Sequence, residues 1–336
     1  MRIGHHDTAD KILIVAEIGN NHEGNFEVAR ELVRRAASCG VDAVKFQTFQ
    51  TRLFTSTRDE ARYRRLSSFE LSYAQFEELE RLARSLGLVF FSTPLDLESA
   101  RFLRPLVDCF KVASGDNDFF ALISLCASTG KPLIISSGLA DLSHLKRVVG
   151  LVRDEWRQRG ISQELAVLHC VTSYPVPPAE ANLAAIPLLA QELGCTIGYS
   201  DHTAGTDAAL AAAALGARIL EKHFTLDRHF SDFRDHQLSA DPDEMKRIVE
   251  GVRRIETLLG KREKVPQPSE TPNVRLARRS IVAATDLRKG QRLAPSDLTW
   301  MRPAVGLAPG AEGQVIGKVL KRDLQFGEPI LPSDLE

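Results

Sequence analysis

Two histidines close neighbouring apolar segments in the second half of the chain and are candidate metal ligands. His202 ends the segment TIGYSDH, and His223 lies in ILEKHFT, the next strand-like segment along the chain. Imidazole nitrogens suit Mn²⁺, Fe²⁺, Co²⁺ and Zn²⁺, and two histidines leave positions open for water and substrate oxygens. The alternative is that either histidine is a hydrogen-bonded residue of the core. Asp201 is placed to orient the His202 ring.

A second set of residues combines cations with hydroxyl groups, which suits a phosphate or a carboxylate. Its members are Lys45, Thr93, Lys111, Ser114 and Ser200. The alternative for each lysine is a salt bridge with an acid inside the protein. Glu17, directly before Ile18 and Gly19, has the placement of a general base or of an acid that positions water.

These candidates gather near the ends of eight strand-like segments, which the chain must bring together. The segments are 12–19, 42–48, 88–94, 109–114, 132–138, 165–171, 196–202 and 219–225. They alternate with helical patterns and are apolar on both faces, which is typical of a parallel sheet covered on each side. Eight such units in about 250 residues predict a (β/α)8 TIM barrel, with an open doubly wound sheet as the alternative. In a barrel, the strand ends form one mouth and the predicted active site lies there.

The sequence changes character after Gly260, which predicts a domain boundary. Residues 1–260 form the expected barrel domain, and residues 261–279 are polar, charged and contain proline, as in a linker. Residues 280–336 contain an internal repeat, because 286–298 and 323–335 both read D-L-x-x-G-x-x-[LI]-x-P-S-D-L. Two copies are too few for a solenoid and predict a small, pseudo-symmetric, β-rich domain.

The composition excludes several classes of protein. Among 336 residues, 43 Lys and Arg balance 44 Asp and Glu, so bulk charge gives no affinity for nucleic acid. The five cysteines lack metal-site spacing and most lie in apolar segments, which favours buried thiols in a reducing compartment. The longest early apolar run, residues 12–16, is too short to act as a signal sequence or to span a membrane. We therefore expect a soluble cytoplasmic protein.

Eight ordered segments resemble the sialic acid synthase (N-acetylneuraminate synthase) family. They are AEIGNNHEGN (16–25), VKFQT (44–48), FFSTPLD (90–96), FKVASGD (110–116), GKPLIISSG (130–138), LHCVTSYP (168–175), GYSDHT (198–203) and LEKHFT (220–225). The segment from RSIVAATDLRKGQRL to the end resembles the antifreeze-like (SAF) domain of the same family. The resemblance extends from about residue 12 to residue 335 and implies a TIM barrel followed by an SAF domain.

The resemblance implies a condensation that depends on phosphoenolpyruvate. The family joins phosphoenolpyruvate to an N-acetylated aldose, such as N-acetylmannosamine, and releases phosphate and a nine-carbon 2-keto acid. It implies a divalent metal, usually Mn²⁺ or Mg²⁺, that activates the sugar aldehyde. It also implies a domain-swapped homodimer and a role in the biosynthesis of surface polysaccharides.

The resemblance also implies a role for individual residues. It makes His202 and His223 the metal ligands and gives catalytic positions to Glu17, Lys45, Lys111 and Asp116. Contacts with phosphoenolpyruvate or the sugar are implied for Thr93, Ser114, Thr172, Tyr174, Ser200 and Asp235. Arg302 matches an arginine that the SAF domain lends to the sugar site of the partner subunit.

The chain departs from the family pattern in the segment that faces the sugar. Where the family usually has GPDH, residues 233–236 read FRDH, so Gly-Pro is lost and Arg234 is gained. Thr172 stands where some members have Asn. The sequence therefore leaves three candidates for the sugar substrate: N-acetylmannosamine, its 6-phosphate, and the di-N-acetylated precursors of legionaminic or pseudaminic acid. The alternatives are a synthase of seven- or eight-carbon keto-sugar acids and a non-catalytic protein that binds sugar or metal.

Overall fold

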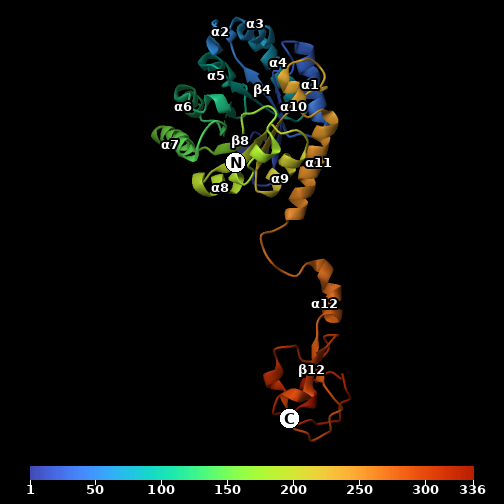
Figure 1. Ribbon diagram of the computed structural model, residues 1–336. Helices are drawn as coiled ribbons and strands as arrows, with labels where there is room; N and C mark the ends of the chain where they lie inside the picture. Colours follow the sequence, from blue (N-terminus) through green and yellow to red (C-terminus); the bar gives the residue numbers. More distant parts are fainter. The chain divides into compact units, whose positions relative to one another are not determined.

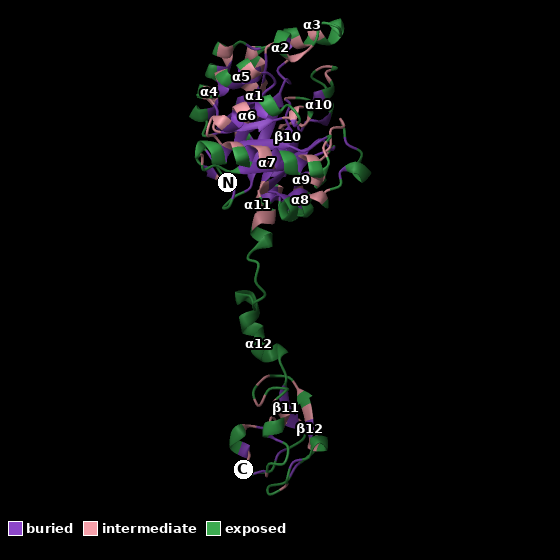
Figure 2. Cartoon of the chain, turned by 90° about the vertical axis from the view of Figure 1, so that its left-hand side faces the viewer, coloured by how far each residue is buried: buried purple, intermediate pink, exposed green.

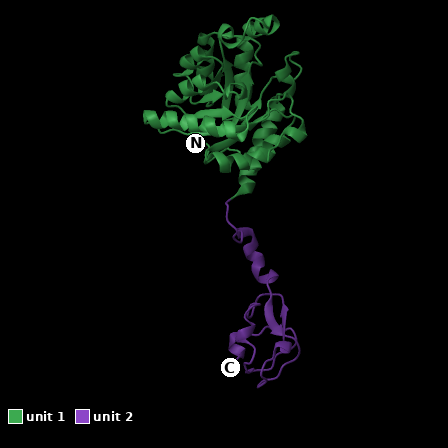
Figure 3. Cartoon of the chain, turned by 60° about the vertical axis from the view of Figure 1, so that its left-hand side comes forward, with its two compact units in different colours: residues 1–260 green, residues 261–336 purple.

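The computed structural model describes residues 1–336, which fold as two compact units, Met1–Gly260 and Lys261–Glu336 (Figure 3). No helix is both long enough and apolar enough to cross a lipid bilayer.

The first unit is built around a closed barrel of eight parallel strands, ringed by helices (Figure 1). Its strands, in barrel order, are β10 (Ile219–His223), β3 (Leu13–Gly19), β4 (Ala43–Thr48), β5 (Val89–Pro94), β6 (Phe110–Val112), β7 (Leu133–Ser136), β8 (Leu165–Cys170) and β9 (Thr196–Asp201). The last strand, β10, pairs with the first, β3, from Ile219–Leu13 to His223–Glu17. This pairing closes the sheet, so the predicted barrel is confirmed and the open doubly wound sheet is excluded.

The longer helices of this unit cover the outside of the barrel. The helices are α1 (Phe26–Ser38), α2 (Thr51–Phe54), α3 (Glu60–Phe69), α4 (Tyr73–Ser85), α5 (Leu97–Leu103), α6 (Phe120–Ser128), α7 (Leu142–Arg159), α8 (Ala185–Leu193), α9 (Asp207–Ala214), α10 (Arg234–Leu238) and α11 (Pro242–Leu259). Of these, α2, α3 and α10 are short additions in the segments that follow β4 and β10. Local signals set several ends: Asn25 caps α1 through its side chain, and Asp241 with Pro242 begins α11. Gly194 ends α8 in the left-handed conformation.

The core lies between the strands and the inner faces of these helices, as the burial colours of Figure 2 show. Phe46 of β4 is fully buried, and its ring centroid lies 6.1 Å from that of Phe76 on α4 and 6.0 Å from that of Phe90 on β5. Aromatic pairs at these separations pack favourably. A short hairpin, β1 (Arg2–Ile3) with β2 (His6–Asp7), precedes the barrel and was absent from the sequence prediction.

The second unit contains α12 (Thr271–Ala277) and an antiparallel pair of strands, β11 (Ser280–Ala283) and β12 (Leu298–Met301). Helix α12 lies within the segment that the sequence predicted to be a linker. Pro272, near the N-terminus of this helix, favours a helix start at that point. Leu287 and Leu324, which are equivalent positions of the two repeats, form an antiparallel bridge. The repeats therefore pair with one another around a small apolar core, as a pseudo-symmetric domain requires.

Candidate active site

A small cavity of about 90 Å³ lies at the carboxyl ends of the barrel strands. Its lining combines two lysines, two glutamates, two histidines and several hydroxyl groups. The predicted residues among its lining are Glu17, Lys45, Thr93, Lys111, Ser114, Thr172, Tyr174, Ser200, His202 and His223. The fold thus brings together residues that are spread over about two hundred positions of the sequence.

The strand register explains why these side chains meet. His223, Glu17 and Lys45 are consecutive partners across β10, β3 and β4, so they form one row of the barrel wall. Ser200 and Glu221 are partners across β9 and β10 in the same way. Because alternate residues of a strand point to opposite faces, a shared register sends each row into the barrel together.

Two lysines and two glutamates form a buried charge cluster at the floor of this cavity. The Nζ of Lys45 lies 3.0 Å from Oε2 of Glu221 and 3.4 Å from Oε2 of Glu17, and all three side chains are at most 5% exposed. The Nζ of Lys111 lies 3.9 Å from Oε1 of Glu221. Each lysine is therefore paired with an acid, as the alternative interpretation of the sequence expected, but both also line the cavity.

Burial and neighbouring charges give the two glutamates opposite shifts in pKa. Burial raises the pKa of Glu17 more than the Lys45 ammonium lowers it. Burial also opposes ionisation of Glu221, but Lys111 and Lys45 outweigh it and hold the pKa of Glu221 below its usual range. Glu221 is therefore the permanent anion of the cluster, and Glu17 is the carboxyl group poised to exchange a proton.

The ammonium group of Lys111 contacts neutral hydrogen-bond acceptors as well as the Glu221 carboxylate. Its Nζ donates to the Ser136 hydroxyl at 2.7 Å and to the Val112 carbonyl at 3.2 Å. Burial lowers the pKa of Lys111 to about 8. With Glu17 protonated, two ammonium groups face one carboxylate, so the floor of the cavity has a net positive charge and suits an anion.

The two histidine rings lie beside one another, with centroids 5.4 Å apart. The Nδ1 of His202 lies 2.9 Å from the Val171 carbonyl oxygen, which leaves Nε2 as its free ring nitrogen. The Nδ1 of His223 is buried and has no hydrogen-bond partner. Burial lowers the pKa of His223 to about 3, so its imidazole is neutral at physiological pH, as a metal ligand must be.

These two rings fit a divalent ion only if water or substrate supplies its other ligands. No group of three or more His, Cys, Asp or Glu side chains is arranged to hold a metal by itself. Two imidazoles with open positions are the donor set of a site that also binds substrate oxygens.

Close packing brings two further hydroxyl groups to the cavity. A Cβ on Gly138 would lie 2.2 Å from Oγ1 of Thr172 and 2.6 Å from Oγ of Ser114, so only glycine fits there. The backbone N–H of Gly138 donates to Ser114 at 3.1 Å. The Thr172 hydroxyl is buried and has no partner, so it is available to a ligand.

Three of the predicted site residues do not line the cavity. Asp116 lies in a 3-10 turn after β6, where burial raises its pKa to about 6. Asp235 is buried on α10, with its carboxylate paired to Arg234. Arg302 is exposed and follows β12 in the second unit. The roles implied for these three residues stay predictions.

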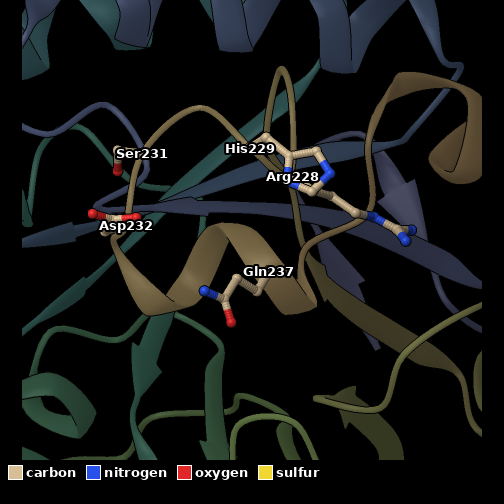
Figure 4. A pocket seen from close by; sticks show the side chains of 5 residues that line it. All are labelled: Arg228, His229, Ser231, Asp232 and Gln237. Atoms are coloured by element: carbon tan, nitrogen blue, oxygen red, sulfur yellow. The ribbon is translucent and has the colours of Figure 1, made fainter.

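A larger concavity of about 770 Å³ lies along the loop between β10 and α10 (Figure 4). Its lining residues are Arg228, His229, Ser231, Asp232 and Gln237. None of them is among the residues predicted for the site. The smaller cavity is the better candidate for catalysis, because it contains the charge cluster and both histidines.

Comparison with known proteins assigns the chain to a family. The model of the NeuB family matches residues 32–264, and the model of the SAF domain matches residues 278–336. The chain belongs to the NeuB family. An uncharacterized protein of Methanocaldococcus jannaschii is 40% identical to it over 323 residues, which are 96% of this chain and 94% of that protein.

Named NeuB-type relatives are similar over most of their length. The N,N'-diacetyllegionaminic acid synthase of Legionella pneumophila is 38% identical over 337 residues, 96% of this chain and 94% of that protein. The crystal structure of N-acetylneuraminic acid (sialic acid) synthetase from Leptospira borgpetersenii, in complex with citrate, has a TM-score of 0.75 and is 30% identical. That match covers 82% of this chain and 94% of the other.

Sequence reasoning gave no role to six residues that line the cavity of this NeuB-family chain: Gln47, Ala113, Gly115, Ser136, Cys170 and Glu221. Ser136 and Glu221 were noticeable as polar residues near strand ends, but their side-chain direction depends on the register. Gln47 donates to Glu17 at 3.1 Å across adjacent strands. The sequence signal that could have pointed to Glu221 is its position beside a lysine and a histidine, in the EKH of residues 221–223.

Proposed function

We propose that this NeuB-family protein condenses phosphoenolpyruvate with an N-acetylated aldose, giving a sialic-acid-type nine-carbon 2-keto acid and phosphate for surface polysaccharide biosynthesis. One observation carries the proposal. A buried cluster with two ammonium groups lies in the same cavity as the imidazole rings of His202 and His223. The names of the Legionella and Leptospira relatives support the same reaction class.

In this proposal, Lys45 and Lys111 bind the phosphate and carboxylate of phosphoenolpyruvate. Thr93 accepts a hydrogen bond from Lys45 at 3.3 Å, so its own hydroxyl hydrogen is free for the substrate. C3 of phosphoenolpyruvate attacks the sugar aldehyde, water adds at C2, and the C–O bond to phosphate then breaks. The ammonium groups stabilise the negative charge that gathers on the departing phosphate.

Glu17 is the residue placed to move a proton. Its raised pKa makes the carboxyl group a proton carrier near neutral pH, and Gln47 holds its Oε1. Its Oε2 has no hydrogen-bond partner and lies on the lining of the cavity. Because its pKa is about 7, Glu17 can ionise near neutral pH, and in the ionised form it takes the proton from the water that adds at C2.

His202 and His223 would hold a divalent metal, Mn²⁺ or Mg²⁺, which polarises the aldehyde carbonyl when bound. The unpartnered Nδ1 of His223 and the single bonded nitrogen of His202 support this role. Tyr174 packs on His202, with ring centroids 4.2 Å apart, and keeps the imidazole on the cavity side.

In this proposal, the second unit of one subunit contributes a residue to the active site in the barrel of the partner subunit. Arg302 is exposed and directly follows β12. We assign it to the sugar site of the partner subunit in a domain-swapped homodimer, as the resemblance to the family implies.

The test is release of inorganic phosphate from phosphoenolpyruvate by the metal-loaded, full-length protein. The sugars are N-acetylmannosamine, its 6-phosphate and the di-N-acetylated hexoses, with arabinose 5-phosphate and erythrose 4-phosphate as the acceptors of the other keto-sugar acid synthases. Turnover confined to N-acetylated sugars supports the proposal. Turnover confined to the two short phosphorylated sugars, or metal binding without any turnover, contradicts it.

A further inference from the structure

Arg234 places a guanidinium group on an aromatic residue of the candidate active site. Its Cζ lies 4.4 Å from the centroid of the Tyr174 ring, close enough for a cation–π contact. Tyr174 lines the cavity, and its ring centroid is 4.2 Å from that of His202. Tyr174 thus contacts both Arg234 and His202.

One edge of this guanidinium is occupied and the other is free. Nε and Nη2 donate to Oδ1 of Asp235 at 3.3 and 3.2 Å. Nη1 makes no hydrogen bond, and the side chain is 63% exposed. The outer edge, formed by Nη1 and Nη2, therefore presents two parallel N–H groups to a ligand.

The segment that carries Arg234, at the start of α10, is anchored on both sides, so the backbone at Arg234 is held in place before a ligand arrives. The Phe233 ring packs edge-on against Phe69, with centroids 5.1 Å apart. On the other side, the His236 ring lies 2.9 Å from Glu23 Oε1 and 2.7 Å from the Thr225 hydroxyl. A group that is already ordered loses less conformational entropy on binding.

The free edge has the geometry of an oxyanion receptor. Two parallel N–H groups match the two oxygens of a phosphate or carboxylate, and a guanidinium is more weakly hydrated than an ammonium. In the proposed function, the Lys45–Lys111 cluster at the cavity floor binds phosphoenolpyruvate. Arg234 is separate from that cluster because it contacts Tyr174 and Asp235 and is absent from the cavity lining.

We propose that Arg234 is a specificity-determining residue that binds an anionic group on the acceptor sugar, at the end remote from its aldehyde. The inference rests on the proposed function, because it assumes that the aldehyde carbon lies at the histidine pair. The anionic group is a phosphate or a carboxylate. This chain therefore selects a charged N-acetylated sugar over its neutral counterpart.

The experiment uses the full-length, metal-loaded protein and three forms of one sugar: N-acetylmannosamine, its 6-phosphate and its 6-carboxylate (the uronic acid). We expect kcat/KM for one of the anionic sugars to exceed that of the neutral sugar about 10- to 100-fold. Arg234→Gln removes this difference and leaves the KM for phosphoenolpyruvate unchanged, whereas Arg234→Lys retains part of it. Arg64→Gln, an exposed arginine paired with Glu60 on α3, is the matched control and changes neither value.

The inference is overturned if kcat/KM for the neutral sugar equals that for both anionic sugars. It is also overturned if Arg234→Gln lowers kcat/KM equally for all three sugars. Direct binding of the same sugars by calorimetry separates this failure from failure of the proposed function. Tighter binding of an anionic sugar that Arg234→Gln abolishes supports the Arg234 site, even if no phosphate is released. Equal binding of the neutral and charged forms rejects it.

Discussion

Lys222 forms a buried ion pair with Asp201, with Nζ 2.9 Å from Oδ2, and each residue directly precedes one of the two histidines of the site. The two residues are register partners across β9 and β10. Since neighbouring residues of a strand point to opposite faces, the pair lies on the outer side of the barrel wall while His202 and His223 lie on the inner side. The pair therefore joins β9 and β10 on the face opposite to the two histidines.

Lys222→Met should destabilise the protein because it leaves the Asp201 carboxylate buried without its partner. We expect a loss of about 3–5 kcal/mol in the free energy of unfolding, measured by urea denaturation. Lys246→Met is the matched control, because Lys246 is 63% exposed and lies 4.0 Å from Glu250. That substitution should cost about 0–1 kcal/mol. If the two substitutions lowered the free energy of unfolding equally, the Asp201–Lys222 pair would make no special contribution to stability.

His223→Ala should abolish metal-dependent turnover and leave the barrel folded. The imidazole lines the cavity with a buried, unpartnered Nδ1, so its removal costs the fold no hydrogen bond. Phosphate release and the affinity for Mn²⁺, measured by calorimetry, should fall together, while the circular dichroism spectrum stays that of the parent. Undiminished Mn²⁺ affinity would remove His223 from the metal site.

The activity should decline at alkaline pH through loss of the Lys111 charge. Burial lowers the pKa of Lys111 to about 8. A lysine is charged below its pKa, so the charged fraction, and with it the affinity for the phosphoenolpyruvate anion, falls as the pH rises through about 8. The measurement is kcat/KM for phosphoenolpyruvate against pH, which reports the free enzyme. A flat profile from about pH 7 to about pH 9 would contradict this role for Lys111.

Arg302→Ala should weaken sugar binding while leaving phosphoenolpyruvate binding intact, if the second unit serves a partner subunit. Mixing it with His202→Ala should then restore part of the activity, because a mixed dimer contains one site with both residues intact. The readout is the rate of phosphate release before and after subunit exchange, with exchange followed by mass spectrometry. Absence of rescue in verified mixed dimers would argue against shared sites.

The barrel itself was predictable from local patterns. Eight apolar segments alternating with helices are a local property of the chain, and the barrel strands lie inside the predicted segments. The histidines and lysines were predictable for the same reason, because a polar residue at the end of a buried strand needs a partner or a ligand. Helix α12 and the hairpin of β1 and β2 escaped prediction, since short elements have weak periodicity.

Side-chain convergence depended on the tertiary structure. Asp116 and Glu221 both lie near strand ends, yet only Glu221 lines the cavity, because Glu221 is a strand residue in register with Ser200 whereas Asp116 lies in a turn beyond the end of β6. The contact of Arg234 with Tyr174 joins residues sixty positions apart, and it forms because Phe233 anchors the loop over the barrel mouth. Local sequence specifies which face of a strand is polar, whereas closure of the barrel determines which polar groups meet.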